Sequence, residues 1–163
     1  MAYQKLQVSN GLDVITSDSV RIPNPDTFVA SGTDGDASVA GTFSSATATF
    51  IDDRVRAGAI IYATSKAYYV VSVDSQTSLT VSTADGTIAG ATTVFQIYNE
   101  ASPGCILFVG EAGNMGIQLA QQNGNANTTE LTFNGIASGA FLPTQAIRVD
   151  KTKTTALNII ALW

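Results

Sequence analysis

The sequence predicts an all-β protein, and three features of its 163 residues support that class. Glycine, alanine, serine, threonine and β-branched residues are abundant, which favours strands and turns over long helices. Short apolar or alternating runs recur between turn signals at regular spacing, as in small barrels and sandwiches. The best helical window, residues 116–122, is short and runs into a polar stretch. We therefore expect an antiparallel β-sandwich or barrel as a host domain, with an inserted module that resembles a small β-barrel.

Prolines mark the borders expected for the inserted module. Pro23 and Pro25 would interrupt a strand ladder, because proline has no backbone N–H to donate, and Pro103 stands at the other border. The predicted division is a discontinuous host β-domain and an inserted β-module, covering residues 1–26 with 101–163 and residues 27–100 respectively. After a loop at 32–36, the module should contain short strands at residues 46–51, 58–63, 67–73, 77–82 and 94–98. One continuous sandwich without this boundary is the alternative.

The host segments carry strand patterns of their own. They predict short strands at residues 4–8, 12–15, 19–22, 104–110, 115–120, 129–133 and 145–150. The short polar side chains of residues 16–18 predict a turn, because they bond locally to the backbone. The dipeptide Asn134-Gly135 predicts a tight turn. In the strand that ends at residue 150, Arg148 and Asp150 should face outward.

The closing stretch, residues 154–163, is the strand around which the chain is expected to be organised. Its side chains alternate between two faces, one with Leu157, Ile159, Ala161 and Trp163 and the other with Asn158, Ile160 and Leu162. Both faces are apolar except at Asn158, whereas a strand with one solvated face would carry polar residues there. The apolar run at 104–110 is the best pairing partner. The centre of a sheet within one domain and a subunit interface explain this pattern equally well, and the residues predicted for the oligomer or core interface are Ile159, Ile160, Leu162, Trp163, Leu107 and Phe108.

Composition narrows the class of protein further. Charged residues make up 13% of the chain, about half the usual share, and hydrophobic residues make up 45%. This balance argues against disorder and suggests that part of the surface does not face free water. The net charge of −5, with no basic patch, disfavours nucleic acid as a partner. The sequence has no run of about 18 apolar residues, so we expect no membrane span. It has no signal-peptide pattern either, so we expect the protein to be synthesised and folded in a cytoplasm.

Residue types that commonly carry out catalysis are scarce. The chain has no histidine, which removes the commonest general base, the Ser–His and Cys–His pairs and most zinc sites. The single Cys105 excludes an internal disulfide and lies in an apolar run, where a buried thiol is expected. The glycines of residues 110–116 are spaced as in a nucleotide-binding loop. They lack the Lys-Ser/Thr of a phosphate loop, however, and a hairpin turn explains them better.

The carboxylates predict no active site or metal site. Asp52 and Asp53 are adjacent, so on a strand they would face opposite ways, and a turn is the better interpretation. Asp34 and Asp36 resemble a fragment of a calcium loop, but the further oxygen ligands and the closing glutamate are missing. We therefore expect no catalytic, cofactor-binding or metal-binding residue, and we do not expect an enzyme.

Four tyrosines suggest a different kind of site. If they were exposed on one face of the module, they would form a glycan-facing surface made of Tyr62, Tyr68, Tyr69 and Tyr98. Aromatic residues at strand positions belong more often to the core or to cross-strand pairs. In the polar loop at 121–128, Asn127-Thr128-Thr129 fits a glycosylation acceptor without an accompanying secretion signal.

Two stretches of the chain carry a family resemblance. The first is ITSDSVRIPNP, and the second runs from GCILFVGEAGN through LTFNGIASGAFLPTQAIRV to TTALNIIALW. Their landmarks fall on residues 107–110, 132–134, 139, 142–143 and 161–163. Together they resemble small virion proteins of tailed bacteriophages and gene transfer agents, which are described as head-spike base or capsid-surface proteins. The resemblance covers the host domain, while the inserted module is similar to β-modules of phage structural proteins.

This resemblance implies a non-enzymatic structural protein of a tailed-phage virion. It would form a symmetric homo-oligomer, a trimer or pentamer, on the capsid surface as a decoration or head-spike base protein, after synthesis in the bacterial cytoplasm. The implied partners are the major capsid protein and other head-spike or fibre proteins, with no cofactor, nucleic acid or membrane. A tail or baseplate component and a carbohydrate-binding host-adhesion module are the alternatives.

Overall fold

Two antiparallel sheets of six strands each form the fold in the computed structural model, which describes residues 8–88, 92–120 and 130–163. Within these ranges the one helical element is a short 3-10 helix, η1 (Pro25–Thr27). The predicted all-β class is therefore confirmed. Nearly all of the strand expected at 4–8, the polar loop at 121–128 and the acceptor at Asn127 lie outside the described residues. None of the described segments forms a helix long and apolar enough to cross a membrane.

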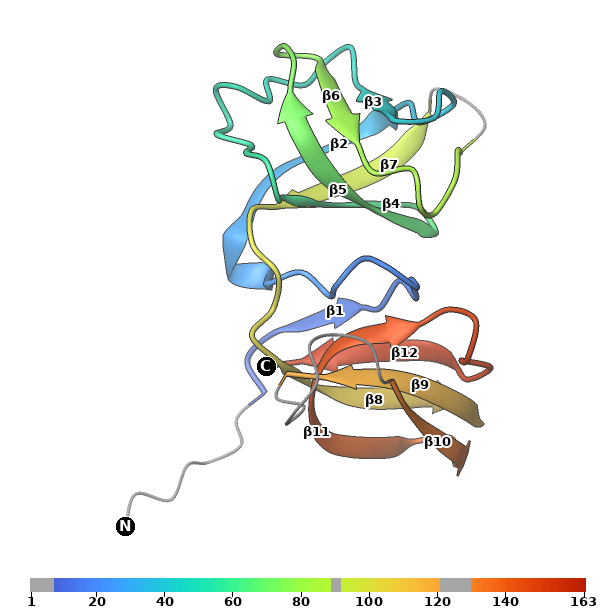
Figure 1. Ribbon diagram of the computed structural model, residues 1–163. Helices are drawn as coiled ribbons and strands as arrows, with labels where there is room; N and C mark the ends of the chain where they lie inside the picture. The colour runs from blue at the N-terminus through green and yellow to red at the C-terminus, as the bar shows by residue number, and fades with distance from the viewer. Residues whose placement is uncertain (1–7, 89–91, 121–129) are drawn as a thin grey trace.

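The first sheet combines one early strand with the last five strands, in the order β1-β12-β8-β11-β9-β10. Their bounds are β1 (Gly11–Asp13), β8 (Cys105–Glu111), β9 (Gly113–Leu119), β10 (Leu131–Ile136), β11 (Ala140–Asp150) and β12 (Leu157–Leu162). β8 and β9 follow each other with only Ala112 between them. β11 pairs with β8 through its first half and with β9 through its second half. The sheet therefore curls around its own core, as Figure 1 shows.

Apolar side chains from alternate positions of these strands fill the inside of the curl. Among the most completely buried are Leu107, Val109, Met115, Ile117, Val149 and Ala161. Successive side chains of a strand point to opposite faces, so each strand contributes every second residue. Burying each large aliphatic side chain stabilises the fold by about 1.5–3 kcal/mol.

Glycines allow the segment that enters β12 to pack directly on β8 and β9. A Cβ atom on Gly113 would lie 2.7 Å from the Cα atom of Ala156. A Cβ atom on Gly116 would lie 2.7 Å from the Cβ atom of Lys153. The glycine spacing in residues 110–116 therefore reflects close backbone packing. The predicted hairpin turn is wrong, because β8 and β9 do not pair with each other.

The second sheet has the order β2-β7-β4-β5-β6-β3. Its strands are β2 (Phe28–Gly35), β3 (Thr42–Ser44), β4 (Ile60–Ala63), β5 (Lys66–Val73), β6 (Ser78–Val81) and β7 (Thr93–Tyr98). As the sequence predicts, a short connection joins β4 to β5, with Ala63 paired to Lys66. The core of this sheet centres on the rings of Phe43, Phe50 and Phe95, whose centroids lie 5.1 to 6.3 Å apart.

Two segments of the second sheet differ from the prediction. Residues 46–51 contain turns and no strand, and Phe50 enters the core from a turn. The loop expected at 32–36 lies almost wholly within β2. A Cβ atom on Gly32 would lie 2.5 Å from the ring of Phe95. This glycine therefore leaves room for the aromatic core inside a strand, where the sequence suggested a loop.

Asn134-Gly135 forms a bulge, and the tight turn predicted there is wrong. β10 continues through both residues, with a shift in register after Phe133. Gly135 has a φ of 65°, and its N–H donates a hydrogen bond to Asn114 Oδ1 at 2.9 Å. The turn into β11 falls at residues 137–139. A left-handed glycine serves a bulge as well as a tight turn, so the dipeptide alone could not separate the two.

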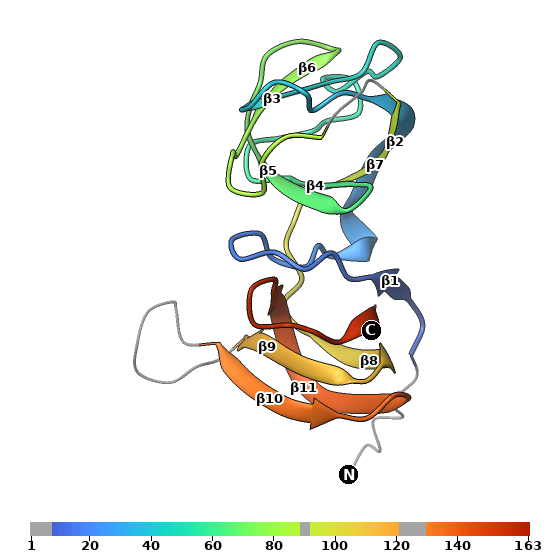
Figure 2. The same cartoon turned by 90° about the vertical axis from the view of Figure 1, so that its right-hand side faces the viewer.

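The two sheets lie one above the other and are joined by two chain segments that run together, as Figures 1 and 2 show. Pro23 and Ala101 form an antiparallel bridge where these segments meet, with backbone hydrogen bonds on either side. The strands of the first sheet come from residues 11–13 and 105–162, and those of the second come from 28–98. The division into a discontinuous host domain and an inserted module stays a prediction.

A small apolar group, which we call the junction cluster, holds the two sheets together. Its members are the buried Val20, Ile60, Tyr62 and Ala67 and the partly buried Leu12, Ile15, Tyr69 and Ala101. The backbone N–H of Arg21 donates a hydrogen bond to the Tyr69 hydroxyl at 2.9 Å. Strands β4 and β5 of the second sheet therefore pack against the segment that follows β1.

Gly113→Ala should lower the free energy of unfolding by about 1–3 kcal/mol, because the added Cβ atom would overlap the backbone of Ala156. Gly11→Ala is the matched control, since its Cβ atom would meet its nearest neighbours at ordinary distances of 3.4 to 3.8 Å. Urea denaturation of both variants gives the comparison. Equal stability of the two variants would contradict the close packing described for β8 and β9.

Candidate functional site

The closing strand is docked on both of its edges. β12 pairs with β1 on one side and with β8 on the other, so the predicted pairing with the run at 104–110 is confirmed. The carbonyl of Trp163 accepts a hydrogen bond from the N–H of Ser9 at 2.7 Å. The indole N–H of Trp163 donates to the Ser102 hydroxyl at 3.0 Å. These contacts fix the end of the chain against the sheet.

The inner face of β12 belongs to the core. Ile159 is 5% exposed, and Leu107 on β8 is fully buried. Both residues were predicted for an oligomer or core interface, and the structure assigns them to the core. Leu157 was expected on the same face, but it is 58% exposed because the left-handed backbone of Asn158 (φ 53°) breaks the alternation.

The outer face of the same strands is also apolar, and we call it the outer apolar face. It consists of Ile106, Phe108, Phe141, Ile160 and Leu162. Cross-strand pairs bring these residues together, since Phe108 lies opposite both Ile160 and Phe141, and Leu162 lies opposite Ile106. All five are only partly buried or exposed within the described chain.

Phe141, like Ile106, is a member of this face that the sequence did not single out. It is 62% exposed, and its ring centroid lies 5.1 Å from that of Phe108. The register of β11 places it directly across from Phe108. Two adjacent apolar runs in the sequence could have suggested the pair, but only the register establishes it.

A cleft of about 600 Å³ lies between the two sheets, next to the outer apolar face. β1 and Ile160 line one side of it, and Val94 and Gln96 of β7 line the other. Val94 is 59% exposed. Because Ile160 belongs both to the cleft and to the outer apolar face, the two features form one continuous surface.

The tyrosines do not form the glycan-facing surface. Tyr62, Tyr68 and Tyr98 are 6%, 2% and 4% exposed, and Tyr69 is half-buried in the junction cluster. The hydroxyls of Tyr68 and Tyr98 donate hydrogen bonds to the Gly86 carbonyl at 2.8 Å and to Gln96 Oε1 at 2.9 Å. Burial raises the pKa of Tyr68 to about 12 and also raises the pKa values of Tyr62 and Tyr98. The glycan-facing expectation is wrong for the three buried residues, because their rings pack inside and between the sheets.

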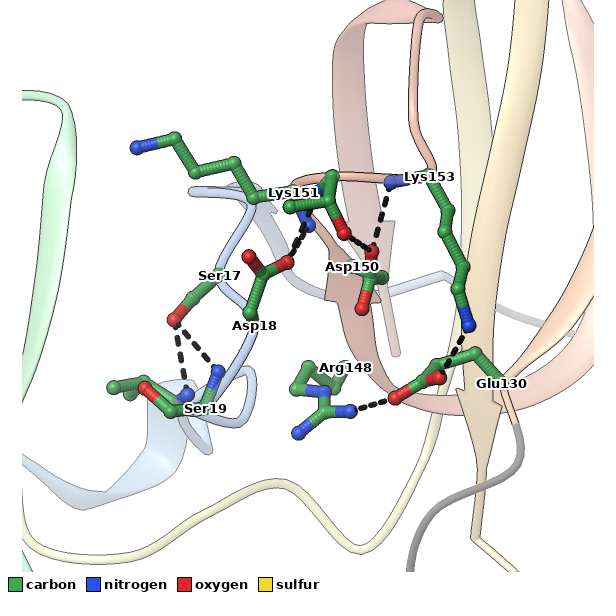
Figure 3. Close-up of polar contacts among 10 residues, drawn as sticks. Ser17, Asp18, Ser19, Glu130, Arg148, Asp150, Lys151 and Lys153 are labelled. Carbon is green, nitrogen blue, oxygen red and sulfur yellow. Dashed lines mark hydrogen bonds and ion pairs between the residues drawn. The ribbon is translucent and has the colours of Figure 1, made fainter. Parts of the chain in front are cut away.

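A polar network ties residues 17–20 to the turn between β11 and β12 (Figure 3). The Ser17 hydroxyl accepts hydrogen bonds from the N–H groups of Ser19 and Val20 at 3.2 and 3.0 Å, so the predicted turn is confirmed. Oδ1 of Asp18 accepts from the N–H groups of Lys151 and Thr152 at 2.8 and 2.9 Å. This part of the resemblance motif therefore acts as a clamp on the turn that precedes the closing strand.

The ionic part of the network is close by. Glu130 pairs with Arg148 and, at 2.8 Å, with Lys153. The side chains of Glu130 and Arg148 are only 10% and 12% exposed. The hydrogen bond from Lys153 lowers the pKa of Glu130 and raises that of Lys153. Asp150 was expected to face outward, but it is 5% exposed because it accepts hydrogen bonds from the turn that follows it.

The other carboxylates considered for metal or acid–base chemistry serve local structure. Asp34 accepts hydrogen bonds from the Ser45 hydroxyl at 2.7 Å and from Thr47, and these bonds lower its pKa. Asp52 and Asp53 lie in a turn, as predicted. The described residues contain no group of three or more histidine, cysteine, aspartate or glutamate side chains that could hold a metal ion.

Cys105 lies in the core of the first sheet. Its thiol contacts the carbonyl of Ala146 at 3.2 Å, and burial raises its pKa to about 12.

Comparisons with protein families, curated proteins and solved structures found no match to this chain. Its function is therefore inferred from the geometry of its own residues.

Glu130→Gln should lower the free energy of unfolding by roughly 1–3 kcal/mol at neutral pH, because it leaves the poorly exposed Arg148 guanidinium without its carboxylate partner. The pKa of Glu130 is lowered in the folded protein, so its contribution is present above the ordinary value of 4.5. The contribution is lost as the pH falls through the lowered folded-state pKa, and the difference between variant and wild type should therefore shrink in acid.

Glu100→Gln is the control for this measurement. Glu100 pairs with Arg56 at 2.5 Å, but the two side chains are 57% and 58% exposed, so the expected loss is only about 0–1 kcal/mol. Urea unfolding of both variants at neutral and at acidic pH gives the comparison. A loss at Glu130 that does not change with pH would contradict the assigned ion pairs.

Proposed function

We propose that this protein is a non-enzymatic structural component that assembles as a symmetric homo-oligomer through its outer apolar face. The observation that carries the proposal is the row formed by Phe141, Phe108 and Ile160 across three adjacent strands. A single exposed apolar residue is ordinary on a protein surface, whereas a contiguous apolar patch indicates an interaction site. Closed symmetry is the usual outcome when identical chains bury such a patch.

The surroundings of the face support this proposal. Polar residues bound its end at Asn158 and Glu111, which share a hydrogen bond of 2.7 Å between Asn158 Nδ2 and Glu111 Oε1. Both residues are exposed. An apolar centre with a polar rim is typical of protein–protein interfaces. The aromatic pair of Phe108 and Phe141 would supply anchors of the kind that dominate binding energy.

We propose the surface of a phage capsid as the place of assembly, with the major capsid protein as a partner. The resemblance of the host segments to small virion proteins supports this location on the virion. In the proposed arrangement the first sheet forms the oligomer and contacts the capsid. The inserted module then projects outward, consistent with its position beyond the junction cluster in Figure 1.

Phe141→Glu should weaken self-association by at least about tenfold, because it introduces a charge into the apolar patch that the copies would bury. The substitution should leave the fold intact, since Phe141 is already 62% exposed. Val71→Glu, at a residue 58% exposed on the second sheet, is the matched control. Sedimentation velocity over a range of concentrations measures both variants and the wild type. A wild-type protein that stays monomeric at every concentration would refute the proposed oligomer.

The proposed location on the capsid surface is tested separately on virions. Antibodies against the inserted module should decorate the capsids of virions that contain this protein, and electron microscopy would locate the label. Label confined to the tail or baseplate would contradict the capsid location while leaving the homo-oligomer untouched.

A further inference from the structure

The cleft between the sheets has features that the proposed homo-oligomer does not use. β1 is an edge strand, with β12 on one side and the cleft on the other. A second, smaller hollow lined by Phe28 and Tyr98 shares Gly11, Leu12 and Gln96 with the cleft. The two hollows therefore form one groove that runs along the whole of β1.

β1 carries backbone groups that its own sheet does not use. Val14 donates a hydrogen bond to the closing segment at 2.9 Å, and the carbonyl of Asn10 accepts one from it at 3.1 Å. In an antiparallel ladder the residues between such pairs direct their backbone groups to the opposite edge. The Asn10 side chain accepts from the N–H of Gly11 at 3.0 Å. The carbonyl of Gly11 and both backbone groups of Asp13 are then left facing the groove.

The lining of the groove defines the chemistry that it can accept. Asp13 is the single charged residue among those that line either hollow, and it is exposed. Val94 and Ile160 provide apolar contacts on opposite sides. Tyr62 is buried at the base of the groove, and its hydroxyl lies beside the backbone of Ile15. A free strand edge with apolar walls is suited to an extended peptide segment.

We propose that this groove binds an extended segment of a different protein, which adds to β1 as a strand and places a lysine or arginine beside Asp13. Charge complementarity favours a different protein over a second copy. The described edge strands of this chain are β1, β2, β3 and β10, and none of them contains a lysine or arginine. Pairing β1 with β1 of a second copy would supply no cation for Asp13, and the register that places Asp13 opposite Asp13 would bring two carboxylates together, which is unfavourable. This site shares Ile160 with the outer apolar face, but the proposal does not depend on the homo-oligomer.

A labelled peptide tests the proposal on the full chain. The probe is a capped, fluorescein-labelled nonapeptide, Ser-Val-Thr-Val-Lys-Val-Thr-Val-Ser, and fluorescence anisotropy measures its binding. We expect saturable binding to the wild type that Asp13→Lys weakens by at least about tenfold. A peptide that carries glutamate in place of the lysine should bind the Asp13→Lys variant more tightly than the wild type. Asp52→Lys, at an exposed turn, should change nothing. The Lys peptide methylated on alternate backbone nitrogens should not bind, because it cannot pair with β1.

Val94→Lys gives a second, independent variant on the opposite wall, and it should also weaken binding of the Lys peptide. Circular dichroism identifies a variant that fails to fold. If either Asp13→Lys or Val94→Lys fails, peptide binding by the other variant tests the proposal. Absence of saturable binding to the wild type would overturn the proposal, as would binding that is insensitive to Asp13→Lys and Val94→Lys in the folded state. Equal binding of the methylated peptide would exclude strand addition. Displacement of the probe from the wild type by an excess of the Asp13→Lys variant, which is expected to bind the probe only weakly, would identify a second copy as the occupant and would also overturn the proposal.

Discussion

The pairing of β12 with β1 on one side and β8 on the other is the contact on which the first sheet depends. β1 is contributed from before the inserted module and β8 from after it, so the closing strand brings together segments that are distant in the sequence. The close approach at Gly113 lets the segment that enters β12 pack directly against the start of β9. The Asp18 clamp fixes the turn that leads into this strand. Without β12, the early strand would have no partner in the first sheet.

The same pairing explains how the chain accommodates a second sheet. The bridge between Pro23 and Ala101 brings together the two ends of the segment that forms the second sheet, so the strands of the first sheet can assemble beside it. The junction cluster then seats the second sheet on the segment after β1. One consequence is the groove beside β1, because the module covers only part of that edge. The other is a continuous surface that runs from this groove onto the outer apolar face.

The sequence was informative where one physical effect determined the pattern. Alternation identified most strands, including β6 within the stretch predicted at 77–82, and the two-sided apolar pattern of the closing stretch identified β12. The prediction failed where a glycine is compatible both with a loop or turn and with a strand. Gly32 and Gly135 suggested a loop and a turn, but they serve aromatic packing and a bulge that depend on distant residues. The outer apolar face was found only in part, because the position of Phe141 depends on the register between β8 and β11. The groove has no local sequence signal, since it arises from how the two sheets meet.

The central claim is that identical copies bury the outer apolar face, and oxidative footprinting tests it most directly. Hydroxyl radicals modify exposed phenylalanine rings, and mass spectrometry reads the modification at each residue. The account predicts that Phe108 and Phe141 become protected as the protein concentration rises, while Val71 on the second sheet keeps its reactivity. Reactivity of both rings that stays the same from dilute to concentrated solution would contradict the claim.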